Sequence, residues 1–87
     1  MWKEDKINKL DFAKYLGLTE AQINKIVSKM RQRLTVFAPS IGGITMLDIH
    51  EAAAIEFVHN HMEEMSQDDA CDLAVRAFYK RRVARVK

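Results

Sequence analysis

The sequence predicts a mainly α-helical fold in which two short helices, a β-hairpin and two further helices follow one another in a single domain. Apolar residues recur at helical spacing over most of the 87 residues. The spacing changes to alternation in one short stretch, and Thr, Asp or Ser precedes each later helix as an N-cap. We expect the first helix pair over residues 12–30, the hairpin over 34–47, and the last two helices over 48–65 and 67–86.

Residues 12–30 have the pattern of two helices joined by a tight turn. Gly17 stands where a left-handed residue can end the first helix, and Thr19 with Gln22 forms a capping box for the second. The apolar face of the first helix consists of Phe12, Ala13 and Leu16, and that of the second of Ile23, Ile26, Val27 and Met30. This order of small residue, turn glycine and locking apolar residue predicts a DNA-binding helix-turn-helix.

The second helix, expected from Glu20 to about Arg31, has a polar outward face. Gln22 or Asn24 can bind adenine in a bidentate way, and lysines on the same face can reach phosphate or guanine. An ordinary solvated helix face carries the same residue types, and the preceding turn favours the DNA interpretation. The candidate DNA contacts on this helix are Thr19, Glu20, Ala21, Gln22, Asn24, Lys25, Ser28 and Lys29.

Residues 34–47 predict two short strands around a turn. Leu34, Val36 and Ala38 alternate along the chain, and so do Ile44 and Met46. A hairpin directly after a recognition helix is a wing, which contacts the sugar-phosphate backbone or the minor groove. The candidate contacts here are Arg31, Arg33, Ser40, Gly42, Gly43 and Thr45. For the two glycines, a hairpin turn with no further role is the favoured alternative.

The last two helices are expected to begin at caps. Asp48 with Glu51 caps a helix of roughly residues 49–65, and Ser66 with Asp69 caps the final one. The final helix has two apolar stripes where its own core needs one, so we expect the second to face another copy of the chain. The first stripe consists of Ala70, Leu73, Ala74, Ala77 and Phe78, and the second, the candidate dimer surface, of Val75, Tyr79, Val83 and Val86.

Charge is divided unevenly along the chain. Residues 1–47 hold eight Lys/Arg and four Asp/Glu, residues 48–72 hold eight acids and no Lys/Arg, and residues 73–87 hold six Lys/Arg and no acid. We expect the acidic middle to pair with the basic ends, within the chain or between copies. A basic face that carries the helix-turn-helix is the arrangement expected of a phosphate-binding protein.

Composition narrows the classes of function. The single cysteine, Cys71, excludes an internal disulfide framework, and we place the protein in the cytoplasm of a bacterium or phage-infected cell. No apolar run is long enough to span a membrane, and the opening residues do not have the pattern of a signal peptide. His59 and His61 point apart on a helix, and no nucleophile accompanies the acids. We therefore expect no enzyme, no metal and no cofactor.

The sequence FAKYLGLTEAQINKI from Phe12 to Ile26 resembles the opening of MerR-like and excisionase-like winged helix-turn-helix proteins, and the similarity extends through the hairpin to DIHEAAAIEFV. It covers about residues 9–60. The resemblance implies a dimeric protein that binds duplex DNA, with Thr19, Gln22, Asn24 and Lys25 in the contacting segment. The arginine and tyrosines common there in MerR-type proteins are replaced, and no effector domain or long coiled coil follows. Ligand sensing is therefore not implied.

Together these features predict a sequence-specific duplex-DNA-binding protein, most simply a small repressor-type transcription regulator of phage or mobile-element origin. An excision or packaging factor would use the same contacts. The alternative from another class is a protein-interaction module, an inhibitor or adaptor, that uses the fold without DNA. Glu20 at the start of the recognition helix and the net charge of only +2 favour that alternative.

Overall fold

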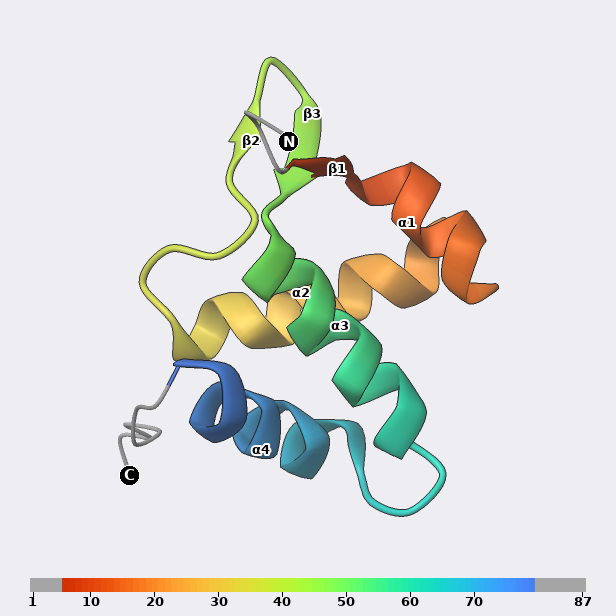
Figure 1. Ribbon diagram of the computed structural model, residues 1–87, viewed down its shortest axis with the longest axis vertical. Coiled ribbons are helices and arrows are strands. Elements are labelled where there is room, and N and C mark those ends of the chain that lie inside the picture. The colour runs from red at the N-terminus through yellow and green to blue at the C-terminus, as the bar shows by residue number, and fades with distance from the viewer. Residues whose placement is uncertain (1–5, 80–87) are drawn as a thin grey trace.

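The computed structural model describes residues 6–79 as a mainly α domain of four helices with a small antiparallel sheet (Figure 1). Residues 1–5 and 80–87 lie outside this range. The elements in chain order are β1 (Ile7–Asn8), α1 (Lys9–Leu16), α2 (Glu20–Arg33), β2 (Ser40–Ile41), β3 (Ile44–Leu47), α3 (Ile49–His61) and α4 (Gln67–Tyr79). In Figure 1, α2 crosses behind α3, α4 lies below both, and the β2–β3 hairpin projects at the top. No helix among residues 6–79 is long and apolar enough to cross a membrane.

The two helices and tight turn predicted over residues 12–30 are confirmed. Gly17 ends α1 with φ of 78°, and the Thr19 side chain accepts from the Gln22 backbone while Gln22 reaches back to the Thr19 N–H. Helix α1 begins three residues earlier than expected, because Asn8 caps it by accepting from the N–H groups of Leu10 and Asp11. The first helix therefore includes Lys9.

The sheet differs from the prediction in two ways. Its strand order is β1-β3-β2, and β1, which the sequence did not predict as a strand, pairs Ile7 with Leu47. Residues 34–38 form no strand, since Leu34 caps α2 while Phe37 and Ala38 turn into the core. The predicted turn is confirmed: Gly42 and Gly43 have φ of 62° and 81° and join β2 to β3, as a tight hairpin requires.

The predicted caps of the last two helices are also confirmed. Asp48 and Glu51 form a reciprocal capping box, and the Asp69 N–H donates to Ser66 Oγ. Helix α3 ends at His61 rather than near residue 65, because residues 62–65 turn the chain so that α4 packs against α3. Met62 lies in this turn and is exposed.

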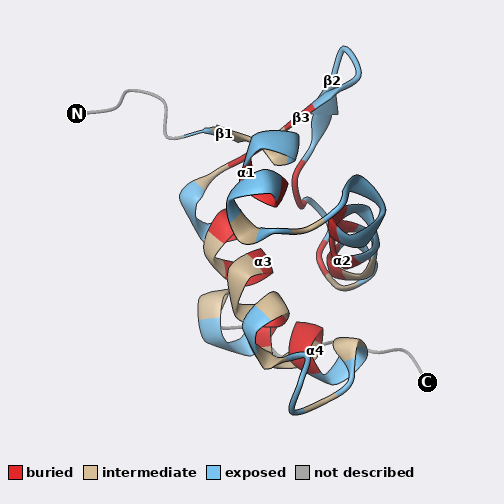
Figure 2. Cartoon of the chain, turned by 90° about the vertical axis from the view of Figure 1, so that its right-hand side faces the viewer, coloured by how far each residue is buried: buried red, intermediate tan, exposed pale blue. Residues whose placement is uncertain are grey.

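The core lies where the inner surfaces of α2, α3 and α4 meet, with α1 and β3 closing its upper part (Figure 2). Its largest fully buried side chains are Ile23, Ile26, Met30, Leu47, Ile55, Val58, Val75 and Cys71. Burial raises the pKa of the Cys71 thiol to about 11, so this cysteine is a packing residue that is protonated at neutral pH.

Replacing Gly17 with alanine is expected to lower the free energy of unfolding by about 1–2 kcal/mol. An added Cβ meets no atom within 4 Å, so the cost arises from the left-handed backbone rather than from a clash. Urea denaturation measures the loss, and Gly17→Asn should lose less because asparagine tolerates this conformation better. An equal loss in both variants would contradict the backbone explanation.

Candidate nucleic-acid interface

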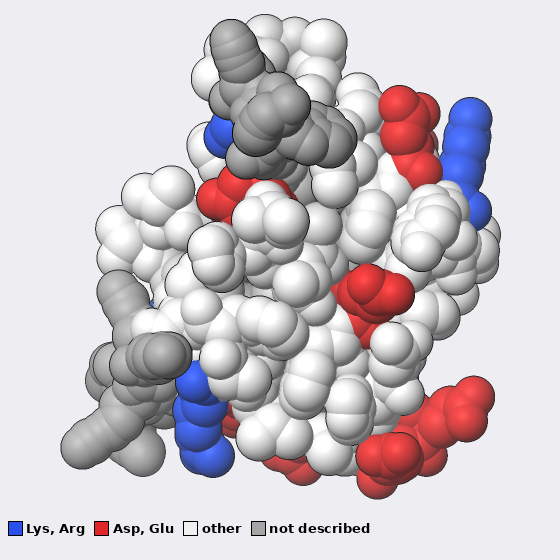
Figure 3. All heavy atoms as spheres, in the orientation of Figure 1, with Lys and Arg blue, Asp and Glu red and all other residues white. Residues whose placement is uncertain are grey.

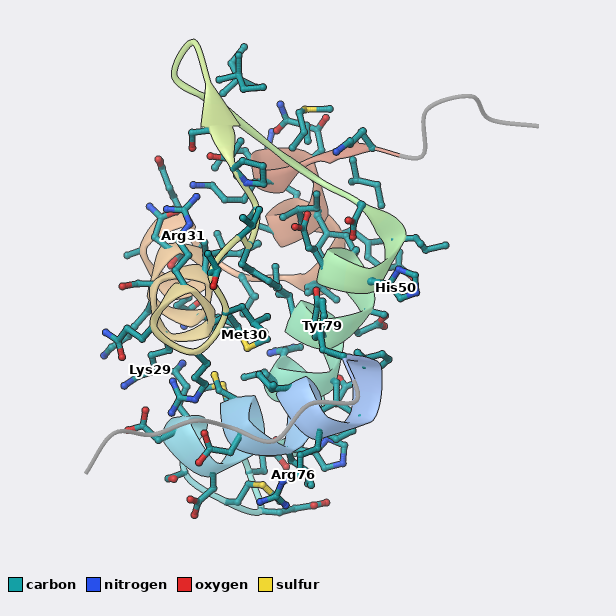
Figure 4. The ribbon with its side chains drawn as sticks, turned by 90° about the vertical axis from the view of Figure 1, so that its left-hand side faces the viewer. Lys29, Met30, Arg31, His50, Arg76 and Tyr79 are labelled. Carbon is teal, nitrogen blue, oxygen red and sulfur yellow. The ribbon has the colours of Figure 1, made fainter. Side chains whose placement is uncertain are left out.

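Helix α2 presents one outward face between two flanks. Its buried side holds Ile23, Ile26, Val27 and Met30. Asn24 and Arg31 lie on the flank next to α1 and the hairpin, and Lys29 and Arg33 lie on the flank next to α4. Figure 4 views α2 nearly end-on and shows Arg31 and Lys29 on these opposite sides. The outward face consists of the exposed residues Ala21, Lys25, Ser28 and Gln32.

A cation from α1 lies beside the candidate base-reading residue of α2. Lys9 Nζ donates to Asn24 Oδ1 over 2.5 Å, and Asn24 is exposed. The contact places a positive charge from the first turn of α1 beside the flank of α2 that carries Asn24. Sequence reasoning missed Lys9 because it started α1 too late, and the asparagine before Lys9 was the available signal.

The base of the hairpin is tied to two helices at Ala38. The Arg31 guanidinium on α2 donates to the carbonyl oxygens of Phe37 and Ala38, while Glu51 Oε2 on α3 accepts from the Ala38 N–H at 2.8 Å. Ala38 is fully buried and has a φ of 50°, which a non-glycine residue adopts only at a cost. Arg31 thus binds the carbonyl oxygens around Ala38, and Glu51 binds its N–H group. Together they fix the direction of the hairpin relative to α2.

The other flank of α2 is neutralised by α4. Arg33 Nε lies 2.6 Å from Asp72 Oδ1, and both Arg33 and Lys29 contact Asp68 Oδ1, at 3.1 and 3.0 Å. Burial alone would lower the pKa of Arg33, but its hydrogen bonds with Asp72 and Asp68 outweigh that effect and raise it. The hydrogen bonds from Lys29 and then Arg33 lower the pKa of Asp68. The expected pairing between the acidic middle and a basic end therefore occurs within the chain.

Most residues of the predicted site are exposed to solvent, and three are wholly or partly buried. Arg33 is withdrawn, because its side chain is 7% exposed and bound to α4. Thr45 is also withdrawn, since it is buried and its hydroxyl shares a hydrogen bond with Ser40 at 2.5 Å. Lys29 is half-buried in its ion pair. The predicted residues that remain exposed are Thr19, Glu20, Ala21, Gln22, Asn24, Lys25, Ser28, Arg31, Ser40, Gly42 and Gly43.

The tip of the hairpin is apolar rather than polar. Ile41 and Ile44 are opposite each other in the register, and their side chains are 79% and 54% exposed. No Lys, Arg, Asp or Glu occurs in residues 34–47. Sequence reasoning concentrated on the hydroxyls and glycines and missed these isoleucines, although their position on both sides of the glycine pair is visible in the sequence.

The prediction that Val75 belongs to a dimer surface is wrong. This residue is fully buried, and the core stripe of α4 runs through Ala70, Cys71, Ala74 and Val75. Ala70 and Ala74 were expected there, whereas Leu73 is only half-buried and Ala77 is exposed. Tyr79 is half-buried and meets the Phe37 ring edge-on, with centroids 6.3 Å apart. Burial raises the pKa of Tyr79, whose hydroxyl has no hydrogen-bond partner among residues 6–79. Val83 and Val86 lie outside the described residues.

His61, at the end of α3, packs within its own helix. His61 stacks on Phe57 at a centroid distance of 4.1 Å, and its Nδ1 lies 2.8 Å from the Phe57 carbonyl oxygen. Within the described part of the chain, no group of three or more His, Cys, Asp or Glu residues is arranged to hold a metal ion.

Comparison with known proteins finds no matching family model, no matching curated protein and no matching solved structure. These comparisons assign the chain to no family.

Proposed function

We propose that the protein binds duplex DNA as a winged helix-turn-helix, with α2 in the major groove and the β2–β3 hairpin as its wing. The outward face of α2 carries the proposal. Its exposed side chains are short, amide-bearing or cationic, and they follow a capped turn whose buried residues fix the helix to the core. Asn24 would read a base, and Lys9 and Lys25 would bind phosphate or guanine.

The distribution of charge supports this docking face. Acidic side chains gather at the α3–α4 turn, which lies at the lower right in Figure 3, while α2 is behind α3 in that view. On α4, Asp68 and Asp72 neutralise the flank of α2 that faces them and leave its outward face free of acids from α4. DNA would therefore approach α2 from the side of α1 and the hairpin, where Lys9 and Arg31 lie.

A small regulator of transcription, of repressor type and dimeric on a symmetric site, is the role we propose for this binding. Excision or packaging of phage DNA would use the same contacts. Half-sites about one helical turn apart would support a dimer.

Binding to a pool of random duplexes, followed by sequencing of the bound fraction, tests the proposal. We expect a motif to be enriched and the logarithm of the affinity to fall with the logarithm of salt concentration, by about 0.9 for each phosphate contacted. Several such contacts should give a slope of roughly −3 to −6. Weak binding that enriches no motif would contradict it.

A protein-interaction role is the second candidate. Glu20 is exposed in the first turn of α2, where its carboxylate would oppose phosphate. If the random pool enriches nothing, capture of a protein partner by the exposed face of α2 becomes the better explanation.

A further inference from the structure

The hairpin ends in a narrow apolar edge. The two turn residues, Gly42 and Gly43, have no side chains, so Ile41 and Ile44 are the outermost side chains of the hairpin. They share a face with Met46, and together with Pro39 these residues line an open hollow of about 380 Å³. Among residues 6–79 no other element covers the two isoleucines, which are more than half exposed.

Cations flank this edge on two sides. Lys6 lines the hollow beside Ile41 and Ile44, and Arg31 lines a separate hollow with Val36, Pro39 and Ser40. Pro39 belongs to both hollows, so the apolar surface is continuous between the two cations. No acidic residue occurs between Arg31 and Leu47. An apolar edge between two positive charges complements a groove with a phosphate strand along each wall.

We propose that Ile41 and Ile44 form a wedge that enters the minor groove of DNA and partly unstacks a base step. The proposal rests on the proposed DNA binding and specifies how the hairpin takes part in it. A hairpin without charged side chains cannot bind phosphates by ion pairing, and the strong exposure of Ile41 and Ile44 favours apolar contact with bases. Proteins that insert isoleucine, leucine or similar side chains bend the duplex by about 20–90° toward the major groove.

The attachment of the hairpin suits this role. Arg31 and Glu51 fix its base at Ala38, and Arg31 belongs to the same helix as the proposed base-reading residue Asn24. The wedge therefore keeps a set position relative to α2. Steps that unstack easily, such as a pyrimidine followed by adenine, should be the preferred sites of entry.

The test uses a duplex of alternating dT and dA in which 2-aminopurine replaces one central adenine, with a fluorophore pair on the two ends. The fluorescence of 2-aminopurine rises on unstacking, and energy transfer between the ends rises on bending. The wild-type protein should raise the 2-aminopurine fluorescence by about twofold or more and increase energy transfer. A duplex of alternating dG and dC should bend less.

The variant with Ile41→Ser and Ile44→Ser should keep its thermal unfolding midpoint and lose both signals. Ile49→Ser is the matched control, because Ile49 is 61% exposed but lies at the start of α3, and it should behave as the wild type. Ile41→Met with Ile44→Met keeps the apolar edge and should retain both signals.

Wild-type protein that binds both duplexes without unstacking or bending either would overturn the wedge and leave the proposed DNA binding intact. No binding to either duplex would overturn the wedge, and a random pool from which no motif is enriched would overturn the proposed DNA binding as well. A serine variant that bends DNA as well as the wild type but changes the mass of the free protein in light scattering would show that the edge is instead an interface between protein chains.

Discussion

Replacing Glu51 with alanine is expected to lower the free energy of unfolding by about 2–4 kcal/mol. Glu51 is 6% exposed, and its two carboxylate oxygens accept from the N–H groups of Ala38 and Asp48, each at 2.8 Å. Alanine would leave the Ala38 donor buried without a partner and would open the capping box of α3. Urea denaturation followed by far-ultraviolet circular dichroism measures the change.

The matched control for this prediction is Glu56→Ala on the same helix. Glu56 is partly exposed and makes no hydrogen bond or ion pair with other described residues, so its replacement should change stability by no more than about 0.5 kcal/mol. Glu51→Gln keeps one acceptor and should fall between the two. Equal losses for Glu51→Ala and Glu56→Ala would show that the bond to Ala38 does not stabilise the fold.

A double-mutant cycle of Arg31 and Glu51 measures how far their two contacts at the base of the hairpin depend on each other. Arg31 and Glu51 hold opposite sides of Ala38, whose left-handed conformation needs support. Once Glu51→Ala releases the Ala38 N–H, Arg31→Ala should cost less than it does in the wild type. The two changes should therefore not be additive, as is usual for residues that share a contact.

Local chemistry made part of this fold predictable from sequence. The turn at Gly17, the capping boxes at Thr19 and Asp48 and the glycine pair of the hairpin each depend on residues within four positions of one another. The exposure of Asn24, Lys25 and Ser28 followed from helical spacing in the same way.

The errors arose where distant parts of the chain decide the structure. Strand β1 has two residues and exists because β3 offers it an antiparallel partner nearly forty positions later. Arg33 is withdrawn from the candidate site by Asp72, which lies 39 residues away. Val75 belongs to the core because α4 packs with the face that carries Cys71 and Val75 toward α2 and α3. Two apolar stripes of similar composition do not indicate which of them faces the core.

The change with the largest expected effect on function is Asn24→Ala combined with Lys25→Ala. We expect the affinity for an enriched duplex to fall roughly 100-fold, because an asparagine–adenine pair contributes about 1–3 kcal/mol and a lysine–phosphate contact adds to it. Both side chains are exposed, so stability should change by no more than about 0.5 kcal/mol. Fluorescence anisotropy at several salt concentrations measures the affinity, and the salt slope should become shallower by about 1.

Lys29→Ala is the control that locates the contact face. Lys29 lies on the same helix but pairs with Asp68 on the α4 flank, so its loss should lower the affinity much less than the double change. The ion pair is at the surface, and its removal should cost only about 0–1 kcal/mol of stability. If Lys29→Ala weakens binding as much as the Asn24 and Lys25 variant, DNA approaches α2 from the side of α4. In that case α4 would have to move before the duplex could bind, because the carboxylates of Asp68 and Asp72 occupy that flank.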